Sequence, residues 1–510
     1  MRLLLAALCL AGCATAPVRD ERDAFFGSLV IPELRIDLQD REVAQLEQDP
    51  RSYVPATLTE GGAVHRGIGI KLKGAAGSFR EIGDRPAITV HLSKFTKGRT
   101  LHGLTKFHLN NSVQDETCLN EFLASELLRA AGVPAPRVAH ARLWLNGRDL
   151  GLYVLKEGVD ATFLARHFPA TAGNLYDGGF VQEIDVDLEK DGGTGPDDRS
   201  DLKALAAACR EEDLDARWMA VEKRLDVDAF ITFTAMELMM GHWDGYALNV
   251  NNYRVYFHPF DGRAHFLPHG MDQLFQDPGA SIFEARSLVA STVMGRNAWR
   301  AAFRRGVQRL LPLFAVGRVS GIVDPVVARL RPMMPEGYDD AVRDLMARIA
   351  ARVESMKEQL ARPVPPLTEI DAKGVARLGP WQALSEGDDA TIELAARDGR
   401  EVMRFRAGPG GVCIASYRQR VHLPHGTYVF RALVRAEEVL SIRDEWGSGA
   451  GLRTSIEGRV NRVAGTTGWR ELVCPIDVPG DSREMDLVIE LRAKQGEAWF
   501  DRGSIRLIRE

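Results

Sequence analysis

The chain has 510 residues, a net charge of −5 and 45% hydrophobic residues. This length predicts two or three domains, and the composition is ordinary for a globular protein. Proteins that bind nucleic acids carry a clustered positive surface, and no long basic run occurs in this chain. We therefore expect no nucleic-acid partner.

The first residues, MRLLLAALCLAGCATAP, combine an arginine, a short apolar run and small residues before Cys13. This pattern is typical of a secretory signal and is too short for a stable membrane span. The ending LAGC resembles the bacterial lipobox, which implies a lipid anchor on Cys13 and places residues 1–24 in the signal and tether. No Asp follows Cys13, and in lipoproteins this favours the outer membrane or cell surface within the cell envelope. The alternative is an ordinary cleaved signal with an accidental cysteine.

Residues 25–157 read as a strand-rich lobe that contains a single helix. The predicted strands include GSLVIPELRIDL, RGIGIKLKG, PAITVHL and KFHLNN. A run of small residues from Gly74 to Ser78 lies between two of these strands, where backbone N–H groups can approach a phosphate closely. An ordinary glycine-containing hairpin is the alternative, because the run is neither G-x-G-x-x-G nor a Walker loop.

One clear helix is predicted within residues 116–131, and Gly132 and Pro134 end it. Glu126 falls on the apolar stripe of this helix, where a carboxylate needs a cationic partner or hydrogen bonds. The alternative is that Glu126 lies at the margin of the stripe and reaches water. We expect Glu121 to point elsewhere and to be solvated.

The strand LGLYVLKEGVD then passes through Lys156, Glu157 and Gly158 into a new helix. This passage is either a hinge between two lobes, with free backbone groups for an adenine edge, or a plain connecting turn. The acidic segment 183–201 is either a calcium-binding loop or a solvated loop. It lacks the glycine and the closing glutamate of an EF-hand in register.

Residues 158–361 are predicted to be mostly helical from about residue 215, apart from a hairpin at 253–267. Asp244, Asn249 and Asn252 precede this hairpin, which delivers Asp272. A carboxylate and an amide before a hairpin, with a second carboxylate after it, is how phosphoryl-transfer sites gather magnesium and a base. The alternative is a loop of Asx-turns and helix caps. A β-rich lobe followed by a helical lobe predicts a ligand-binding cleft between them.

Pro363, Pro365 and Pro366 end the helical pattern, since proline cannot continue a helix. Short alternating runs follow over residues 369–510, which is typical of an all-β sandwich. The predicted fold class is therefore α+β, two-lobed, followed by that sandwich. This last domain resembles the jelly-roll carbohydrate-binding modules, which implies a possible glycan partner. Four aromatic residues either stack on sugar rings or lie in the core: Trp381, Tyr417, Tyr428 and Trp469.

Cysteine spacing argues against a zinc site, because the chain has no C-x-x-C pair and no His-rich spacing. Cys413 and Cys474 lie in the same predicted domain. They form a disulfide in an oxidising compartment or remain as two buried thiols.

An ordered set of segments resembles the CotH kinase family of atypical, spore-coat-type kinases. The matching segments are GIKLKGAAGSF, GLTKFHLNNSVQDET, ASELLRAAGVPAP, LNGRDLGLYVLKEGVD, NLYDG, HWDGYALNVNNYRVY and LPHGMDQLF. The resemblance implies a protein-kinase-like fold, ATP with Mg²⁺ or another divalent cation, and phosphorylation of Ser or Thr in an extracytoplasmic or coat-type protein.

Carried over by position, the resemblance implies roles for individual residues. Asp244 matches the catalytic-loop aspartate, and Glu126 matches the helix glutamate that pairs with a phosphate-binding cation. Lys73 is our preferred cation, with Arg85 and Lys106 on the same lobe as alternatives. The remaining positions are expected to contact the nucleotide (Gly74, Ser78 and Glu157) or the metal (Asp272, Asn252 and Asn249).

The chain departs from the family pattern at HGMD, where the family often has WDLD, so Gly270 replaces a larger residue before Asp272. Two other functions stay open. The first is a non-catalytic surface-binding or adhesion protein that uses a kinase-like scaffold and a glycan-binding sandwich. The second is an AMP-transferase on the same scaffold.

Overall fold

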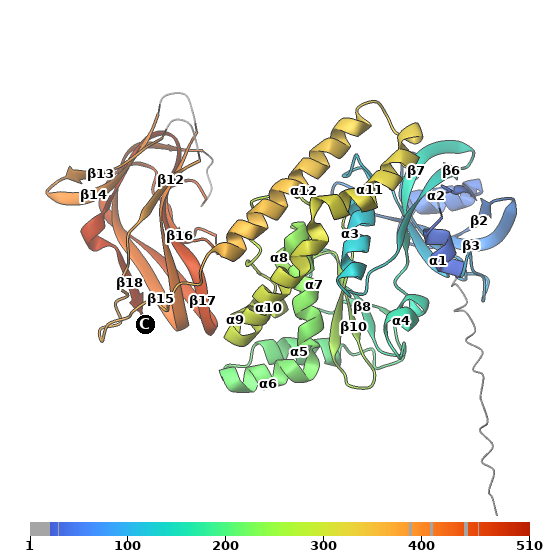
Figure 1. The fold of residues 1–510 in the computed structure, drawn as a ribbon, viewed down its shortest axis with the longest axis horizontal. Coiled ribbons are helices and arrows are strands. Elements are labelled where there is room, and N and C mark those ends of the chain that lie inside the picture. The colour runs from blue at the N-terminus through green and yellow to red at the C-terminus, as the bar shows by residue number, and fades with distance from the viewer. Residues whose placement is uncertain (1–20, 29, 387–389, 409–411, 443–446, 457) are drawn as a thin grey trace, which may run out of the picture.

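The computed structural model describes residues 21–510 apart from 29, 387–389, 409–411, 443–446 and 457. The predicted lipobox and Cys13 lie outside the described residues. Figure 1 shows a β-rich lobe at one end, a helical lobe in the middle and a β-sandwich at the other end. The predicted two-lobed α+β plan followed by an all-β sandwich is confirmed.

The β-rich lobe is a closed barrel with the strand order β1-β2-β3-β4-β5-β7-β6. Its strands are β1 (Glu33–Asp37), β2 (Val54–Glu60), β3 (Ala63–Lys73), β4 (Ala87–His91), β5 (Lys106–Asn110), β6 (Val138–Leu145) and β7 (Arg148–Glu157). Its helices are α1 (Glu21–Phe26), α2 (Asp40–Gln48) and α3 (Asn120–Ala130).

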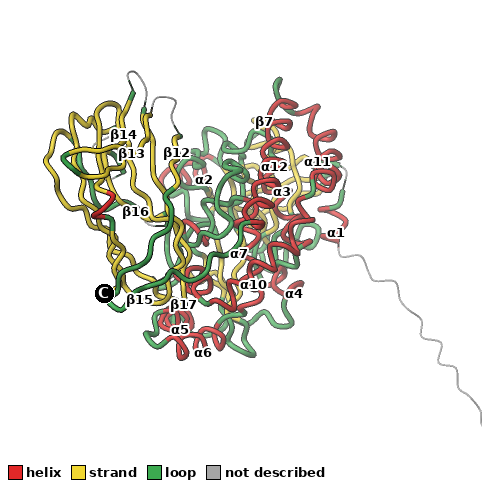
Figure 2. The backbone as a smooth tube through the Cα atoms, turned by 60° about the vertical axis from the view of Figure 1, so that its left-hand side comes forward, coloured by secondary structure: helices red, strands yellow, loops and turns green. Residues whose placement is uncertain are grey.

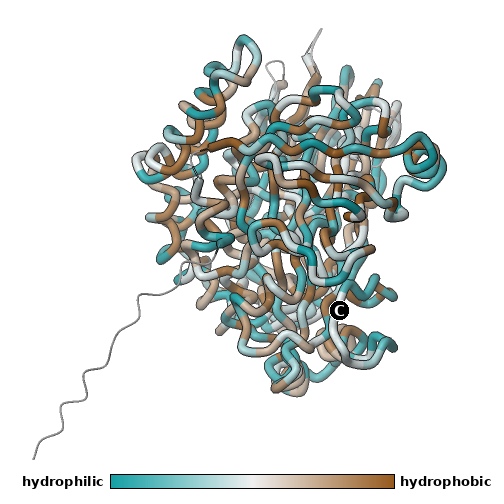
Figure 3. The backbone as a smooth tube through the Cα atoms, turned by 90° about the vertical axis from the view of Figure 1, so that its right-hand side faces the viewer, coloured by the Kyte–Doolittle hydropathy of each residue, from teal (hydrophilic) through white to brown (hydrophobic). Residues whose placement is uncertain are grey.

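Alternation along the strands fills the interior of the barrel. In β1, Leu34 and Ile36 are fully buried between exposed neighbours, and Ile70 of β3 and Leu155 of β7 join them in one core. Burying each such side chain contributes about 1.5–3 kcal/mol. In Figure 3, hydrophobic stretches follow the strands of the barrel, which face the viewer.

The middle lobe packs helices around a four-stranded sheet of order β11-β10-β8-β9. The strands are β8 (Leu175–Asp177), β9 (Glu189–Gly192), β10 (Tyr253–Phe257) and β11 (Ala264–Pro268). The helices are α4 (Ala161–His167), α5 (Ser200–Cys209), α6 (Leu214–Arg224), α7 (Val227–Met240), α8 (Tyr246–Asn249), α9 (Leu288–Gly295), α10 (Asn297–Leu310), α11 (Val316–Leu330) and α12 (Tyr338–Ala361), with short 3-10 turns η1 (Leu311–Phe314) and η2 (Arg331–Met333).

Helix α7 is the central helix of this lobe, and most of its 14 residues are buried. The side chain of Asp226 caps its start by accepting from the backbone N–H of Ala229 at 3.0 Å. Gly241 ends it with φ +64°, a left-handed conformation that favours glycine. This ending places His242, Trp243 and Asp244 directly after a fixed helix end.

The C-terminal sandwich is built on a sheet of order β12-β15-β17-β14-β13, with β16 paired to β17 and β18 paired to β15. Figure 2 shows it as a body of strands separate from the helical lobe. The elements are β12 (Gln382–Ser385), β13 (Ala390–Arg397), β14 (Arg400–Ala407), β15 (Cys413–Ser441), β16 (Gly449–Thr454), β17 (Gly465–Asp501) and β18 (Arg506–Arg509), with the 3-10 turn η3 (Arg502–Ser504).

The structure answers most of the open questions about the sandwich side chains. Cys413 and Cys474 are buried and form no disulfide, so the alternative of two buried thiols is the correct one. Tyr417 and Tyr428 belong to the core. Trp381 stacks on core Phe430 at a ring distance of 6.2 Å.

A loop of β17 docks the sandwich on the helical lobe. The carboxylate of Asp481 accepts from Trp218 Nε1 at 3.2 Å and from the backbone N–H of Asn297, the first residue of α10, at 2.9 Å. Arg300 donates to the backbone oxygen of Ser482 at 2.6 Å. The sandwich therefore supplies a cap for a helix of the neighbouring lobe.

Candidate active site

A buried ion pair lies where α3 meets the barrel. Lys156, near the end of β7, donates to Glu121 Oε1 at 3.1 Å, and both side chains are almost completely buried, at 0% and 3% exposure. Burial raises the pKa of Glu121, but Lys156, Lys73 and a backbone hydrogen bond outweigh it, so the pKa is lowered overall. Glu121 is therefore ionised at neutral pH and compensates a buried lysine.

Lys73, the last residue of β3, joins this pair through an amide. Its Nζ donates to Asn110 Oδ1 at 2.5 Å, and Asn110 Nδ2 donates to Glu121 Oε2 at 2.6 Å. Burial, with a smaller contribution from Lys156, lowers the pKa of Lys73 to about 8, against the opposing effect of Glu121. Two cations are thus linked to one carboxylate, Lys156 directly and Lys73 through Asn110.

The prediction that Glu126 is the helix glutamate that pairs with the phosphate-binding cation is wrong. The Glu126 side chain is 33% exposed and pairs with Arg129 at 3.1 Å on the helix surface, whereas Glu121, which we expected to be solvated, is buried. The reason is that α3 is buried around most of its circumference, so its apolar stripe does not identify one inward face. The sequence did contain one signal for a buried carboxylate partner, because Lys156 lies near the end of an apolar strand.

The segment that carries Asp272 is attached directly to the start of α3. The backbone N–H of Met271 donates to Glu121 Oε1 at 3.2 Å, and Asn120 Nδ2 donates to the backbone oxygen of Asp272 at 2.8 Å. Burial and the nearby Glu121 raise the pKa of Asp272, with Lys73 opposing this shift. Among the described residues, the carboxylate of Asp272 accepts a hydrogen bond from its own backbone N–H and from no other residue.

Asp244 is held by three asparagine amides. Asn249 Nδ2 donates to Oδ1 at 2.6 Å, while Asn251 and Asn252 donate to Oδ2 at 3.1 and 2.8 Å. Buried Glu237 accepts from the backbone N–H groups of the turn that follows Asp244. This arrangement fixes the orientation of the Asp244 carboxylate.

The backbone around Asp244 is strained. Val250 and Asn252 have φ of +46° and +51°, and Val181, on a neighbouring loop, has φ of +51°. Left-handed β-branched residues are outliers that persist only where the surroundings impose them, and they concentrate at functional sites. Both valines are therefore held in place by their neighbours.

Arg352 of α12 connects the end of α7, just before Asp244, to the segment that follows Asp272. Its guanidinium donates to the backbone oxygens of Leu238 and Met239, at the end of α7, at 2.5 and 3.1 Å. It also donates to Pro278, in the segment after Asp272, at 3.0 Å. One buried arginine thus ties the approach to Asp244 to the loop beyond Asp272.

The residues present fit a hard divalent cation. Asp272 offers a half-buried carboxylate, and Asn252 Oδ1 lies so close to Gly270 that a Cβ there would sit 2.0 Å from it. Among the described residues no group of three His, Cys, Asp or Glu side chains could hold a metal. Magnesium is commonly held by one or two carboxylates with substrate phosphates and waters, so this donor set matches it better than zinc.

The glycine run forms a loop bonded to itself. Ser78 Oγ accepts from the backbone N–H of Ala75 at 3.1 Å, and the backbone N–H of Ser78 donates to the Ala75 oxygen at 3.2 Å. Gly74 has φ +100°. The loop directly follows Lys73, at the end of β3.

Two further predicted residues are engaged with protein groups. Arg85 donates to the Leu152 oxygen at 2.5 Å. Glu157 forms a bidentate pair with Arg166 at 2.5 and 2.6 Å. None of these contacts reaches the pair of Lys156 and Glu121.

Lys106 joins the two lobes through the acidic segment. Its Nζ lies 3.1 Å from Asp191 of β9, and Arg254 of β10 donates to the same carboxylate at 2.5 Å. The segment 183–201, for which a calcium-binding loop or a solvated loop was expected, therefore supplies a strand and an inter-lobe ion pair.

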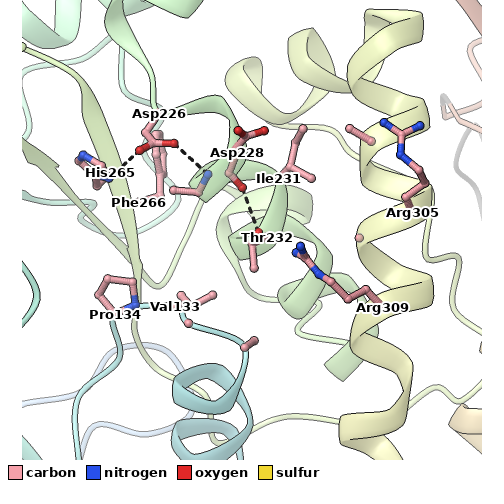
Figure 4. Close-up of a pocket in the computed structure, with 15 residues that line it drawn as sticks. Val133, Pro134, Asp226, Asp228, Ile231, Thr232, His265, Phe266, Arg305 and Arg309 are labelled. Carbon is pink, nitrogen blue, oxygen red and sulfur yellow. Dashed lines mark hydrogen bonds and ion pairs between the residues drawn. The ribbon is translucent and has the colours of Figure 1, made fainter.

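A pocket of about 630 Å³ lies elsewhere on the helical lobe. It is lined by the turn that follows α3, the start of α7, part of β11 and α10. Figure 4 shows Arg305 and Arg309 on the helix across from Thr232. Lys73, Glu121, Lys156 and Asp272 do not line this pocket.

Among the described residues no single helix is long and apolar enough to span a membrane. One bent pair, Asn297–Phe314 with Val316–Met333, meets the criteria of length and composition jointly.

The chain matches a known protein family over more than half of its length. The family described as CotH kinase protein matches residues 77–362, which is more than half of the chain. The chain therefore belongs to the CotH kinase family.

Two curated relatives illustrate the range of this similarity. Invasin CotH2 of Rhizopus delemar is 26% identical over 34% of this chain and 33% of its own length. Inner spore coat protein H of Bacillus subtilis is 22% identical over 48% of this chain and 72% of its own. The chain thus spans about one third of the length of the Rhizopus protein.

Two solved structures are similar to separate parts of the chain. The Helicobacter pylori proinflammatory kinase CtkA, 9% identical, covers 57% of this chain and 96% of its own with a TM-score of 0.28. TmCBM61 in complex with β-1,4-galactotriose, 20% identical, covers 26% of this chain and 90% of its own with a TM-score of 0.19.

Proposed function

We propose that the chain is an ATP-dependent atypical protein kinase of the cell envelope. It transfers the γ-phosphate of ATP to a Ser or Thr of an extracytoplasmic or coat-type protein. The observation that carries the proposal is the attachment of Glu121 both to Lys156 and to the segment of Asp272. Through Glu121, the proposed phosphate-binding cation Lys156 is connected to the segment of the proposed metal ligand Asp272.

Each residue of the cluster has a role in this proposal. Lys156 and Lys73 neutralise the phosphates, and Glu121 fixes Lys156 in position. Asp272 with Asn252 would hold the divalent cation, which supplies charge neutralisation at the β- and γ-phosphates. Asn249 holds Asp244 through its amide nitrogen, and its predicted role as a metal ligand stays a proposal.

The transfer step follows from the fixed carboxylate of Asp244. The acceptor hydroxyl donates its proton toward Asp244 while its oxygen forms a bond to the γ-phosphorus. The bond between that phosphorus and the bridging oxygen of ADP breaks, and ADP leaves with the electron pair. Orientation by three amides makes Asp244 a positioned acceptor of the hydrogen bond, which is the main catalytic contribution in phosphoryl transfer.

The other units of the chain would place this activity. We propose residues 25–361 as the kinase domain and 369–510 as a glycan-binding sandwich. A groove of about 420 Å³ is lined by Ser455, Glu490 and Arg492 of the sandwich and by Arg286 of the helical lobe, among others. Residues 1–24 would anchor the protein to the envelope by lipid on Cys13, and relatives named for spore coats and as invasins support a surface location.

Two alternatives share the scaffold. An AMP-transferase would use the same cluster with the nucleotide reversed. A non-catalytic binding protein would have no use for a buried Lys156, because burying an ion pair often stabilises no more than apolar residues of similar volume. That observation favours nucleotide binding over a bare scaffold.

Transfer assays with two ATP labels test the proposal. The purified full chain is incubated with Mg²⁺, dephosphorylated casein and ATP labelled in either the γ- or the α-phosphate. A kinase incorporates only the γ-label, and Asp244→Asn lowers incorporation by about 100-fold or more. Incorporation of the α-label identifies an AMP-transferase, and absence of both labels with intact ATP binding contradicts both enzymes.

A further inference from the structure

We propose that Phe180, Val181 and Trp243 form a docking surface for an apolar residue next to the acceptor Ser or Thr of the protein substrate. This inference rests on the proposed kinase function and adds a preference for one class of acceptor sequence. The segment 178–183 is called the acceptor loop below.

The three side chains are unusually exposed for their size. Phe180 is 57% exposed, Val181 is 46% exposed and Trp243 is 45% exposed. Single exposed apolar residues are common and need no explanation. These three differ because each belongs to a segment that is connected to the proposed catalytic aspartate.

Short connections link each of them to Asp244. The backbone N–H of Val181 donates to Asn251 Oδ1 at 3.4 Å, and Asn251 Nδ2 donates to Asp244 Oδ2 at 3.1 Å. Phe180 is the neighbour of Val181, and Trp243 directly precedes Asp244. One asparagine side chain therefore separates the acceptor loop from the carboxylate.

The helical lobe holds the acceptor loop in its shape. The backbone N–H of Gly178 donates to the Tyr253 oxygen at 3.0 Å, and Tyr253 Oη donates to the Gln182 oxygen at 2.7 Å. Glu183 accepts from Tyr246 Oη at 2.7 Å and from the backbone N–H of Leu288 at 2.7 Å. A Cβ on Gly178 would lie 2.5 Å from the Tyr253 ring, so glycine is required there.

This fixed loop keeps two apolar side chains in water at a backbone cost. Val181 adopts φ +51°, which a β-branched residue takes only under constraint. A loop without function would relax or carry glycine or asparagine at this position. A rigid loop with an exposed aromatic residue is instead suited to binding, because little conformational entropy is lost when a partner packs on it.

The position selects a polypeptide acceptor as the occupant. We expect a segment whose Ser or Thr hydroxyl reaches Asp244 to pass the acceptor loop and Trp243, since both are connected to Asp244 through short links. The tip of the loop, Phe180–Val181–Gln182, carries no charge. It therefore matches an apolar side chain flanking the hydroxyl and not a phosphate or a charged residue.

Two synthetic peptides of equal length and charge test the preference. Both contain a central Ser; in one, Leu and Phe flank it, and in the other Gly takes these positions. Binding of each fluorescently labelled peptide to the full chain is followed by anisotropy, and γ-phosphate transfer is measured in parallel. We expect the apolar peptide to bind about 10-fold more tightly, and Phe180→Ala to remove that advantage while leaving the Gly peptide unaffected.

Three variants separate docking from folding. Val181→Gly removes the side chain but suits the left-handed backbone, and it is expected to weaken the apolar peptide alone. Phe180→Leu is expected to restore most of the affinity lost in Phe180→Ala. Phe260→Ala is the matched control, because Phe260 is 77% exposed on the hairpin between β10 and β11 and should change nothing.

The outcomes distinguish this inference from the proposed function. Equal binding of the two peptides, or an equal loss in Phe180→Ala and Phe260→Ala, overturns the docking surface. Selective binding without γ-phosphate transfer supports the surface and contradicts the kinase. Binding of a second copy of the chain to the surface, seen as Phe180-dependent dimerisation without peptide preference, also overturns the acceptor proposal.

Discussion

The carboxylate of Glu121 accepts a hydrogen bond from the backbone N–H of Met271 at 3.2 Å, although 150 residues separate them in the chain. Glu121 also pairs with Lys156 inside the barrel lobe. A single side chain therefore connects the barrel lobe to the residue just before Asp272. Movement of α3 would shift the proposed phosphate and metal ligands together.

The first prediction concerns the buried glutamate. Glu121→Gln leaves Lys156 buried without a counter-charge, and breaking such a pair costs about 3–5 kcal/mol of unfolding free energy. Urea denaturation measures this loss. Glu126→Gln is the matched control, because its surface pair with Arg129 contributes only about 0.2–0.5 kcal/mol. Equal losses in the two variants would contradict the assignment of Glu121.

The second prediction is a pH dependence set by Lys73, whose pKa is lowered to about 8 from 10.5. Between these values the unfolded chain binds more protons at this residue, so its contribution to stability rises with pH. ATP binding has the opposite dependence, because Lys73 loses its charge as pH rises through about 8. Calorimetric titration at pH 7 and pH 9 should show weaker ATP binding at the higher pH.

Arginine at position 73 provides the control for this pH dependence. Lys73→Arg keeps its charge at pH 9 and should remove most of the loss, whereas Lys97→Arg at an exposed position should not. A pH profile that is unchanged in Lys73→Arg would assign the effect to another group.

The third prediction tests the close approach of Gly270 to Asn252. Gly270→Ala places a Cβ 2.0 Å from Asn252 Oδ1 in a left-handed backbone, so the amide must move. Displacing a metal-site neighbour typically lowers metal affinity by about 10–100-fold. Binding of Mg²⁺-ATP by calorimetry measures the change.

Gly262→Ala separates backbone strain from this displacement. Gly262 also has a positive φ, but no atom lies within 4 Å of its added Cβ. It should lose about 1–2 kcal/mol of stability and keep its Mg²⁺-ATP affinity. The same loss of affinity in both variants would argue against a role for Asn252.

The fourth prediction concerns the junction of the sandwich with the helical lobe. Asp481→Ala removes the acceptor for Trp218 and the cap of α10, a cap being worth about 1 kcal/mol. Differential scanning calorimetry should show the sandwich and the remainder melting further apart in temperature. Asp477→Ala, at an exposed position on the same strand, should leave the trace unchanged, and a shift of equal size there would contradict the proposed junction.

Local pattern was sufficient to predict the architecture. Alternation in segments such as PAITVHL and the hairpin after Asn252 predicted real strands, and the proline run near Pro363 separated the sandwich. These features depend on interactions within a few residues. The pairing of Cys413 and Cys474 was left open, because spacing along the chain does not determine the distance between thiols.

The inner part of the site was not predictable in the same way. Glu121 and Glu126 differ by little more than one helical turn, and only packing on both faces of α3 decides which is buried. The partner of Glu121 lies on β7 and depends on closure of the barrel. Long-range contacts of this kind leave no local period in the sequence.

The most direct test of the account is calorimetric titration of ATP with Mg²⁺ into the purified full chain and into Asp272→Asn. Asp277→Asn, an exposed aspartate in the same loop, is the matched control. The account predicts magnesium-dependent binding by the wild type and the control, and a loss of about 10-fold or more in Asp272→Asn. Binding of ATP that is independent of both Mg²⁺ and Asp272, or no binding by the folded wild type, would contradict it.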